Sequence, residues 1–228
     1  MNKVSLVGYT NAGKSTLFNM LTGENQLAED KLFATLDPTT RIVDLPDKRR
    51  ILLTDTVGFI KKLPHDLVAA FKATLEEVAE ADLLLHLVDV SHPQSEAQIE
   101  AVNGVLKELN AYDLPTIILF NKIDLPEGDG LLPVLQIKYP DSLGISARTG
   151  DGLEELQTRL TEYFSAQDTE MSLELSYQDG KALDYLYKNG EVLELDYQGD
   201  SIQIRARLPH RCLKALDSLM THSTYLTR

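Results

Sequence analysis

Short runs rich in Val, Ile and Leu alternate with longer amphipathic stretches along most of the chain. Most of the short runs are apolar on both faces, which is typical of strands in a sheet covered by helices on both sides. We predict strands over residues 4–7, 41–45, 51–54, 83–88, 116–120 and 143–146. The longer stretches have apolar residues at helical spacing, and we predict helices over residues 14–21, 67–80, 94–110 and 152–164.

Alternation of strand and helix predicts an α/β fold with a mostly parallel sheet. One connection is too short for a crossover, because only residues 46–50 separate the strands 41–45 and 51–54. These two strands must form an antiparallel hairpin. We therefore expect a six-stranded sheet with one antiparallel strand.

The pattern changes after residue 165. Residues 165–170 are polar and are interpreted as a linker, followed by predicted strands over 173–177, 192–197 and 202–208 and a helix over 180–188. Pro209 is expected to open a final helix, where its missing N–H costs nothing. We predict two domains, 1–167 and 171–228, the second a small α+β unit of βαββα order.

Composition narrows the class of protein. The chain has 228 residues, a net charge of −13 and one cysteine, Cys212. No apolar run is long enough to span a bilayer, and a single cysteine excludes an internal disulfide. We expect a cytoplasmic monomer without a membrane span, and its negative charge disfavours nonspecific binding to nucleic acid.

A glycine-rich segment follows the first strand and precedes the first helix. It fits the pattern G-x-x-x-x-G-K-S, and with the next residue it comprises Gly8, Tyr9, Thr10, Asn11, Ala12, Gly13, Lys14, Ser15 and Thr16. In such a loop the backbone N–H groups surround the phosphates of a nucleotide, the lysine adds a charge, and the serine hydroxyl binds Mg²⁺. An ordinary glycine-rich turn is the alternative, and the placement between strand and helix disfavours it.

A second phosphate motif ends the strand 51–54. Its residues are Asp55, Thr56, Val57 and Gly58, which match D-x-x-G. We expect Asp55 to act in the Mg²⁺ shell and the Gly58 N–H to sense the terminal phosphate. The motif alone is weak, but its position after the hairpin strengthens it.

The motif N-K-x-D follows the strand 116–120 and predicts which base is bound. Its residues are Asn121, Lys122, Ile123 and Asp124. The Asp124 carboxylate can accept both donors on one edge of guanine, whereas adenine has no such pair and would leave the carboxylate unsatisfied. We expect the stem of Lys122 to cover the base, and the segment Ser146, Ala147 and Arg148 to offer the Ala147 N–H to the guanine carbonyl.

A Mg²⁺ site of this kind also needs a threonine from the segment between the first helix and the hairpin. Thr35, Thr39 and Thr40 are all available there, and spacing alone does not choose among them.

The segment FATLDPTTR, residues 33–41, together with GYTNAGKST, LTDTVGFI and LPHDLVAAFKATLEEV, resembles the HflX family of translational GTPases over nearly the whole chain. This resemblance implies a small-GTPase-like P-loop fold and GTP and GDP as ligands. It favours Thr35 as the Mg²⁺-binding threonine and places Phe33, Ala34, Thr35, Leu36 and Asp37 at the nucleotide.

The same resemblance implies action on the large ribosomal subunit, including splitting or rescue of stalled ribosomes by the full-length family. Members of the family carry an N-terminal domain before the GTPase core, so this chain is expected to be either an excised fragment or a natural short form. In relatives with an apolar residue after D-x-x-G, an asparagine at the position of Asn11 holds K⁺; the alternative is that Asn11 only caps the loop.

Phe59 stands where many GTPases have the glutamine that orients the attacking water. Catalysis is therefore assigned to Lys14, Mg²⁺ with Thr35, and the Gly58 amide, with slow intrinsic hydrolysis that a partner stimulates. A slow-turnover guanine-nucleotide scaffold without ribosome activity is the main alternative. An ATP-using P-loop kinase is a third hypothesis, which Asp124 disfavours.

Overall fold

The computed structural model describes residues 1–23, 39–59, 78–128, 130–220 and 224–227. The chain divides into two compact units, Met1–Thr158 and Arg159–Arg228. This division falls inside helix α5 (Leu153–Ser165). The domain limits 1–167 and 171–228 stay a prediction.

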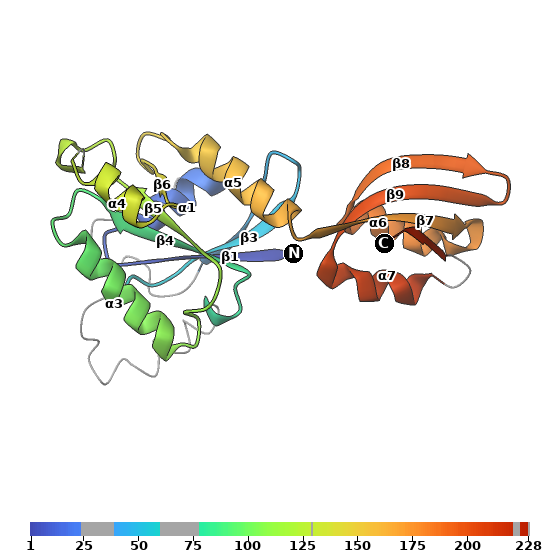
Figure 1. Ribbon diagram of the computed structural model, residues 1–228, viewed down its shortest axis with the longest axis horizontal. Coiled ribbons are helices and arrows are strands. Elements are labelled where there is room, and N and C mark those ends of the chain that lie inside the picture. The colour runs from blue at the N-terminus through green and yellow to red at the C-terminus, as the bar shows by residue number, and fades with distance from the viewer. Residues whose placement is uncertain (24–38, 60–77, 129, 221–223, 228) are drawn as a thin grey trace. The chain divides into compact units, whose positions relative to one another are not determined.

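The first unit is built on a six-stranded sheet in the order β2-β3-β1-β4-β5-β6 (Figure 1). Its strands are β1 (Asn2–Gly8), β2 (Thr39–Asp44), β3 (Arg50–Asp55), β4 (Leu83–Asp89), β5 (Thr116–Asn121) and β6 (Leu143–Gly144). Neighbouring strands are parallel except for β2, which runs antiparallel to β3. The predicted mixed sheet with one reversed strand is confirmed, although β6 is shorter than the predicted strand 143–146.

Helices cover both faces of this sheet (Figure 1). They are α1 (Lys14–Thr22), α3 (Ser95–Glu108), α4 (Leu132–Lys138) and α5 (Leu153–Ser165), with a 3-10 turn at Pro126–Gly128. α3 and α4 share one face, because Ile99 and Leu135 join Val88 and Phe120 in one buried cluster. Sequence reasoning did not predict α4, and most of the predicted helix 67–80 lies outside the described residues.

The hairpin between β2 and β3 closes as its short connection required. The Lys48 N–H donates to the Leu45 carbonyl, and the Leu45 N–H donates to the Arg49 carbonyl. Lys48 adopts φ 64°, the left-handed conformation that a tight turn demands. Register pairs from Thr39–Asp55 to Asp44–Arg50 then bring the start of β2 beside the second phosphate motif.

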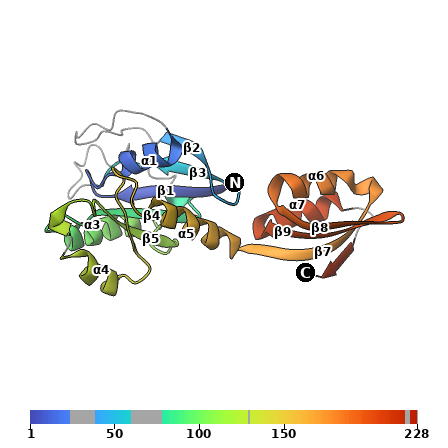
Figure 2. The ribbon, with the colours of Figure 1, turned by 90° about the horizontal axis from the view of Figure 1, so that it is seen from above.

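The second unit is a four-stranded antiparallel sheet in the order β10-β7-β9-β8, with two helices packed on one face (Figure 2). Its elements are β7 (Asp168–Ser176), α6 (Gly180–Asn189), β8 (Glu191–Gln198), β9 (Ser201–Pro209), α7 (Leu213–Leu219) and β10 (Thr224–Thr227), with 3-10 turns at Tyr177–Asp179 and His210–Cys212. Ala182 and Leu186 of α6 and Leu213 and Leu216 of α7 pack on the apolar residues of the sheet.

Three predictions for this unit need correction. The predicted linker 165–170 was wrong from Asp168 onward, because β7 begins there and pairs with β9 as far as Asp168–Pro209. Pro209 ends β9 and is the N-cap of the 3-10 turn His210–Cys212, which leads directly into α7 at Leu213, so the predicted final helical segment is present but starts one position after Pro209. The order is βαββαβ, because β10 adds a strand beside β7.

In the part of the chain that the structure describes, no helix combines the length and the apolar character needed to cross a bilayer.

Candidate functional site

The glycine-rich loop joins β1 to α1, as its sequence predicted. Gly8 is the last residue of β1 and Lys14 is the first residue of α1, with Ser15 and Thr16 following in the first turn of the helix. Backbone hydrogen bonds to Phe59 fix the loop: the Thr10 N–H donates to the Phe59 carbonyl, and the Phe59 N–H donates to the Gly8 carbonyl. Tyr9 forms an isolated parallel bridge with Phe59.

Lys14 lies folded into this loop. Its ammonium donates to the carbonyls of Gly8 and Tyr9, both at 3.2 Å. Burial lowers the pKa of Lys14 to about 8, and the opposing attraction of Asp55 does not offset it. A buried ammonium held at a helix start by neutral carbonyls is suited to receive a negatively charged group.

Two glycines of the site leave no room for a side chain. A Cβ on Gly13, which has φ 99°, would lie 2.2 Å from Asn121 Nδ2. A Cβ on Gly58 would lie 2.9 Å from Thr10 Cγ2 and 3.2 Å from Lys14 Nζ. Glycine therefore allows the backbone of each motif to pack closely against these neighbours.

Ser15 and Asp55 come together although 40 positions separate them. The Ser15 hydroxyl donates to Asp55 Oδ2 at 2.7 Å, and Asp55 is the last residue of β3. Hydroxyl and carboxylate oxygens are the donors that Mg²⁺ prefers, so the residues present fit that ion. Next to them, buried Thr56 donates its hydroxyl to the Leu6 carbonyl and Val57 is 3% exposed.

Asn121 connects the phosphate loop to the loop after β6. Its Nδ2 donates to the Ala12 carbonyl at 2.8 Å, and its Oδ1 accepts from the Ala147 N–H at 2.9 Å. Asn121 is 2% exposed. The predicted donation from the Ala147 N–H to guanine stays a prediction, and it would require this N–H to be shared with Asn121.

Lys122 has a partner that sequence reasoning missed. Its ammonium lies 2.6 Å from Asp89 Oδ2, and Asp89 Oδ1 accepts from the N–H and the hydroxyl of Ser91. Asp89 ends β4 in register with Asn121. Because ligands bind at the carboxyl ends of parallel strands, the position of Asp89 at the end of a predicted strand was a signal for its role. Ile123 follows, with its N–H donating to the Ile145 carbonyl.

Asp124 is held on both oxygens. Ser146 donates its hydroxyl to Asp124 Oδ1 at 2.7 Å, and Arg148 Nη2 lies 2.6 Å from Asp124 Oδ2. The hydrogen bond from Ser146, helped by the charge of Arg148, holds the pKa of Asp124 below its usual value. The carboxylate is therefore ionised and can accept hydrogen bonds.

The remaining predicted residues of the site either lie outside the described residues or make other contacts. Phe33, Ala34, Thr35, Leu36 and Asp37 lie outside the described residues. Of the other two candidate threonines, Thr39 starts β2, and the Thr40 hydroxyl lies 2.9 Å from the Thr54 hydroxyl. Asn11 is exposed, with φ 62°.

Phe59 is 1% exposed and belongs to the buried cluster of Val7, Val78 and Val102. Phe59 is thus part of the hydrophobic core of the first unit.

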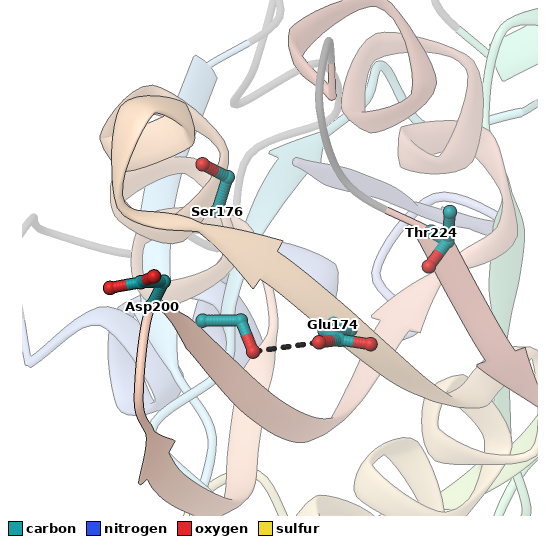
Figure 3. A pocket seen from close by; sticks show the side chains of 5 residues that line it. Glu174, Ser176, Asp200 and Thr224 are labelled. Carbon is teal, nitrogen blue, oxygen red and sulfur yellow. Dashed lines mark hydrogen bonds between the residues drawn. The ribbon is translucent and has the colours of Figure 1, made fainter.

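The second unit has a shallow pocket of its own, lined by Glu174, Ser176, Asp200, Ser201 and Thr224 (Figure 3). The Ser201 hydroxyl donates to Glu174 there at 2.7 Å. Among the described residues, no three His, Cys, Asp or Glu side chains gather in a way that could hold a metal ion. We assign no chemistry to this pocket.

Comparison with known proteins agrees with this geometry. The family described as 50S ribosome-binding GTPase matches residues 3–122. A GTPase HflX of Magnetococcus marinus is 54% identical over 192 residues, which are 84% of this chain and 44% of the relative. A GTPase HflX of Lacrimispora saccharolytica is 46% identical over 212 residues, 93% of this chain and 50% of the relative. This chain thus spans about half the length of these curated relatives.

Among solved structures, a GTP-binding protein from the archaeon Sulfolobus solfataricus in complex with GDP is similar at a TM-score of 0.58 and 29% identity. The match covers 71% of this chain and 51% of that protein. The resemblance to HflX inferred from the motifs is confirmed, and the chain belongs to the family of 50S ribosome-binding GTPases.

Proposed function

We propose that this chain binds GTP and GDP, hydrolyses GTP slowly, and acts as a nucleotide-dependent switch on the large ribosomal subunit. The carrying observation is that one buried side chain, Asn121, joins the phosphate loop to the loop whose Ser146 orients Asp124. This connection supports one site in which the phosphate loop and the ionised Asp124 carboxylate act on the same ligand. The names of the HflX relatives support the same reaction.

Each part of the site has a role in this proposal. The backbone of residues 8–13 and the Lys14 ammonium bind the phosphates. Asp124 selects guanine, because it stays ionised and adenine cannot supply the two donors. In this proposal the Gly58 N–H binds the terminal phosphate, and Lys14 stabilises the charge that develops there.

Ser15, Asp55 and Thr35 are the residues that would hold Mg²⁺. Ser15 and Asp55 are in contact through a 2.7 Å hydrogen bond, and Thr35 is assigned by resemblance to HflX. When bound, the ion neutralises phosphate charge and orients the phosphates. Removal of divalent ions with EDTA should weaken GDP binding, and replacement of Ser15 by alanine should make binding insensitive to Mg²⁺.

Phe59 cannot orient water, so stimulation of hydrolysis must come from elsewhere. K⁺ held at Asn11 is one source; the other interpretation is that Asn11 is present because asparagine tolerates its φ of 62°. Turnover in KCl and in NaCl separates the two. Equal rates would remove K⁺ from the mechanism.

The decisive experiment for the switch is single-turnover GTP hydrolysis with and without purified large ribosomal subunits. Stimulated turnover supports the switch, and tight GDP binding without turnover in either condition supports the scaffold alternative. Equal affinity for ADP and GDP would refute the assignment of the base. An Asp124→Asn variant that retains its preference for guanine would refute it as well.

A further inference from the structure

The outer face of helix α4 exposes large apolar side chains. Leu131, which precedes the helix with helical dihedrals, is 38% exposed, Val134 is 60% exposed and Ile137 is 83% exposed. Leu135, which lies about 160° around the helix from Ile137, is 2% exposed and packs against the sheet cluster. The fold therefore uses one side of α4 and leaves the other apolar side to solvent.

These three residues form one continuous stripe, which we call the α4 stripe. They follow each other at intervals of three residues, so at about 100° per residue they span roughly 120° of the helix surface. A single exposed apolar residue needs no explanation. Three adjacent ones on a short helix form a patch of the kind that marks interaction sites.

The charged residues that flank the α4 stripe along the chain or pair with its helix are mostly acidic. Lys138 forms an ion pair with Glu96 of α3, which lies beside α4 (Figure 2). The hydrogen bond from Lys138 to Glu96 is the main cause that raises the pKa of Lys138. Exposed Glu127 precedes the stripe by four residues and exposed Asp141 follows it by four. Lys138 is thus already paired with a carboxylate, and we call the described carboxylates Glu96, Glu127 and Asp141 the acidic rim.

A large ribosomal subunit offers two kinds of surface, RNA and protein, and the acidic rim favours protein. RNA phosphates would be repelled by the carboxylates and offer no apolar groups to the stripe. A basic protein with apolar anchor residues satisfies both features. We infer that the α4 stripe docks on a basic protein of the large ribosomal subunit, an inference that rests on the proposed action on that subunit.

Co-sedimentation of the chain with purified large subunits, in the presence of a non-hydrolysable GTP analogue, tests the inference. A Val134→Ser, Ile137→Ser double variant should bind about tenfold or more weakly, because interface energy is concentrated in a few apolar anchors. The Val134→Glu, Ile137→Glu double variant should bind still more weakly. Tyr112→Ser is the matched control, since Tyr112 is an exposed large side chain of the same unit, 48% exposed.

The variants change exposed positions, so their thermal unfolding and GDP affinity should equal those of the parent chain. Unchanged subunit binding by both double variants would overturn the inference and leave the proposed GTPase intact. A parent chain that fails to sediment with large subunits would remove the large-subunit proposal and this inference together. Guanine-nucleotide binding and turnover would then still be open to measurement.

Site-specific crosslinking identifies the class of partner. Cys212 is the one cysteine of the chain, so a Cys212→Ser, Ile137→Cys variant can carry a benzophenone maleimide at the stripe alone. Label recovered in a basic ribosomal protein supports the inference. Label recovered in ribosomal RNA, or none recovered while the chain is bound, contradicts it.

Discussion

Asn121 offers the sharpest test of the site, because one buried side chain bridges two of its loops. Replacement by alanine removes a hydrogen bond of 2.8 Å to the Ala12 carbonyl and one of 2.9 Å from the Ala147 N–H. Both backbone groups belong to residues that are 1% exposed, so water does not readily replace the lost partner. Each unsatisfied buried group costs about 1–3 kcal/mol.

We therefore expect Asn121→Ala to lower the free energy of unfolding of the first unit by about 2–5 kcal/mol. GDP affinity should fall as well, since the phosphate loop is no longer fixed relative to the loop of Ser146 and Ala147. Asn121→Asp should keep the acceptor for the Ala147 N–H but turn an oxygen toward the Ala12 carbonyl. Its loss of stability should therefore persist although the side chain has the same shape.

Urea unfolding followed by far-ultraviolet circular dichroism measures this effect, on the transition that added GDP shifts. Asn189→Ala is the matched control, because Asn189 also donates to a backbone carbonyl, that of Tyr185 at 2.9 Å, but does so at an exposed position. Its effect should stay within about 0.5 kcal/mol. An Asn121→Ala chain with parental stability and parental GDP affinity would refute the bridge.

Three further predictions follow from the same geometry. Gly13→Ala should abolish GDP binding and destabilise the first unit, because the added Cβ would lie 2.2 Å from Asn121 Nδ2. Gly104→Ala in α3 is the control: a Cβ added there has no atom within 4 Å and should leave GDP binding unchanged. GDP affinity should fall about tenfold from pH 7 to pH 9, because the pKa of Lys14 is about 8 and the phosphates bind its charged form. Calorimetry that shows no such fall, or the same fall in a Lys14→Met variant, would contradict this prediction. Burial, followed by the charge of Lys14, lowers the pKa of His86 from 6.5 to about 4. Between these two pH values the unfolded chain binds a proton at His86 that the folded chain does not bind. The free energy of unfolding should therefore decrease by about 3 kcal/mol as the pH falls from 6.5 to 4. Urea unfolding should show a shallower decrease in His86→Gln, while exposed His210→Gln should behave like the parent.

The elements that sequence reasoning found were those with a strong local signal. The strands around the phosphate motifs are apolar on both faces, and the connection at 46–50 allowed only a hairpin. Helix α4 was missed because it has seven residues, begins after a loop and turns an apolar stripe to solvent, which hides its amphipathic pattern. Strand β10 has four residues and is defined by its pairing with β7, about 50 positions away.

Within the site, too, residues with a strong local sequence signal were predicted and residues placed by long-range pairing were not. Gly8, Lys14, Asp55, Asn121 and Asp124 were predictable because each belongs to a contiguous motif with fixed spacing. Asp89 belongs to no such motif. Its place at the end of a predicted strand indicated the ligand-binding edge of the sheet, but its contact with Lys122 depends on the register of β4 against β5, which places Asp89 opposite Asn121. Pairing between strands is a property of the folded sheet, and no spacing along the chain encodes it.

The two ion pairs at the predicted base-binding motif differ in what they can contribute. Arg148 is 72% exposed, so solvent screens its attraction for Asp124 and makes it easy to displace. Lys122 and Asp89 are 32% and 15% exposed, and Asp89 is held in addition by Ser91. Orientation of Asp124 therefore depends mainly on the Ser146 hydroxyl, and that of Lys122 on Asp89. It follows that a guanine N–H can replace Arg148 at Asp124 Oδ2 at little cost in free energy. Loss of Asp89, by contrast, would remove the group that orients Lys122, the residue expected to cover the base.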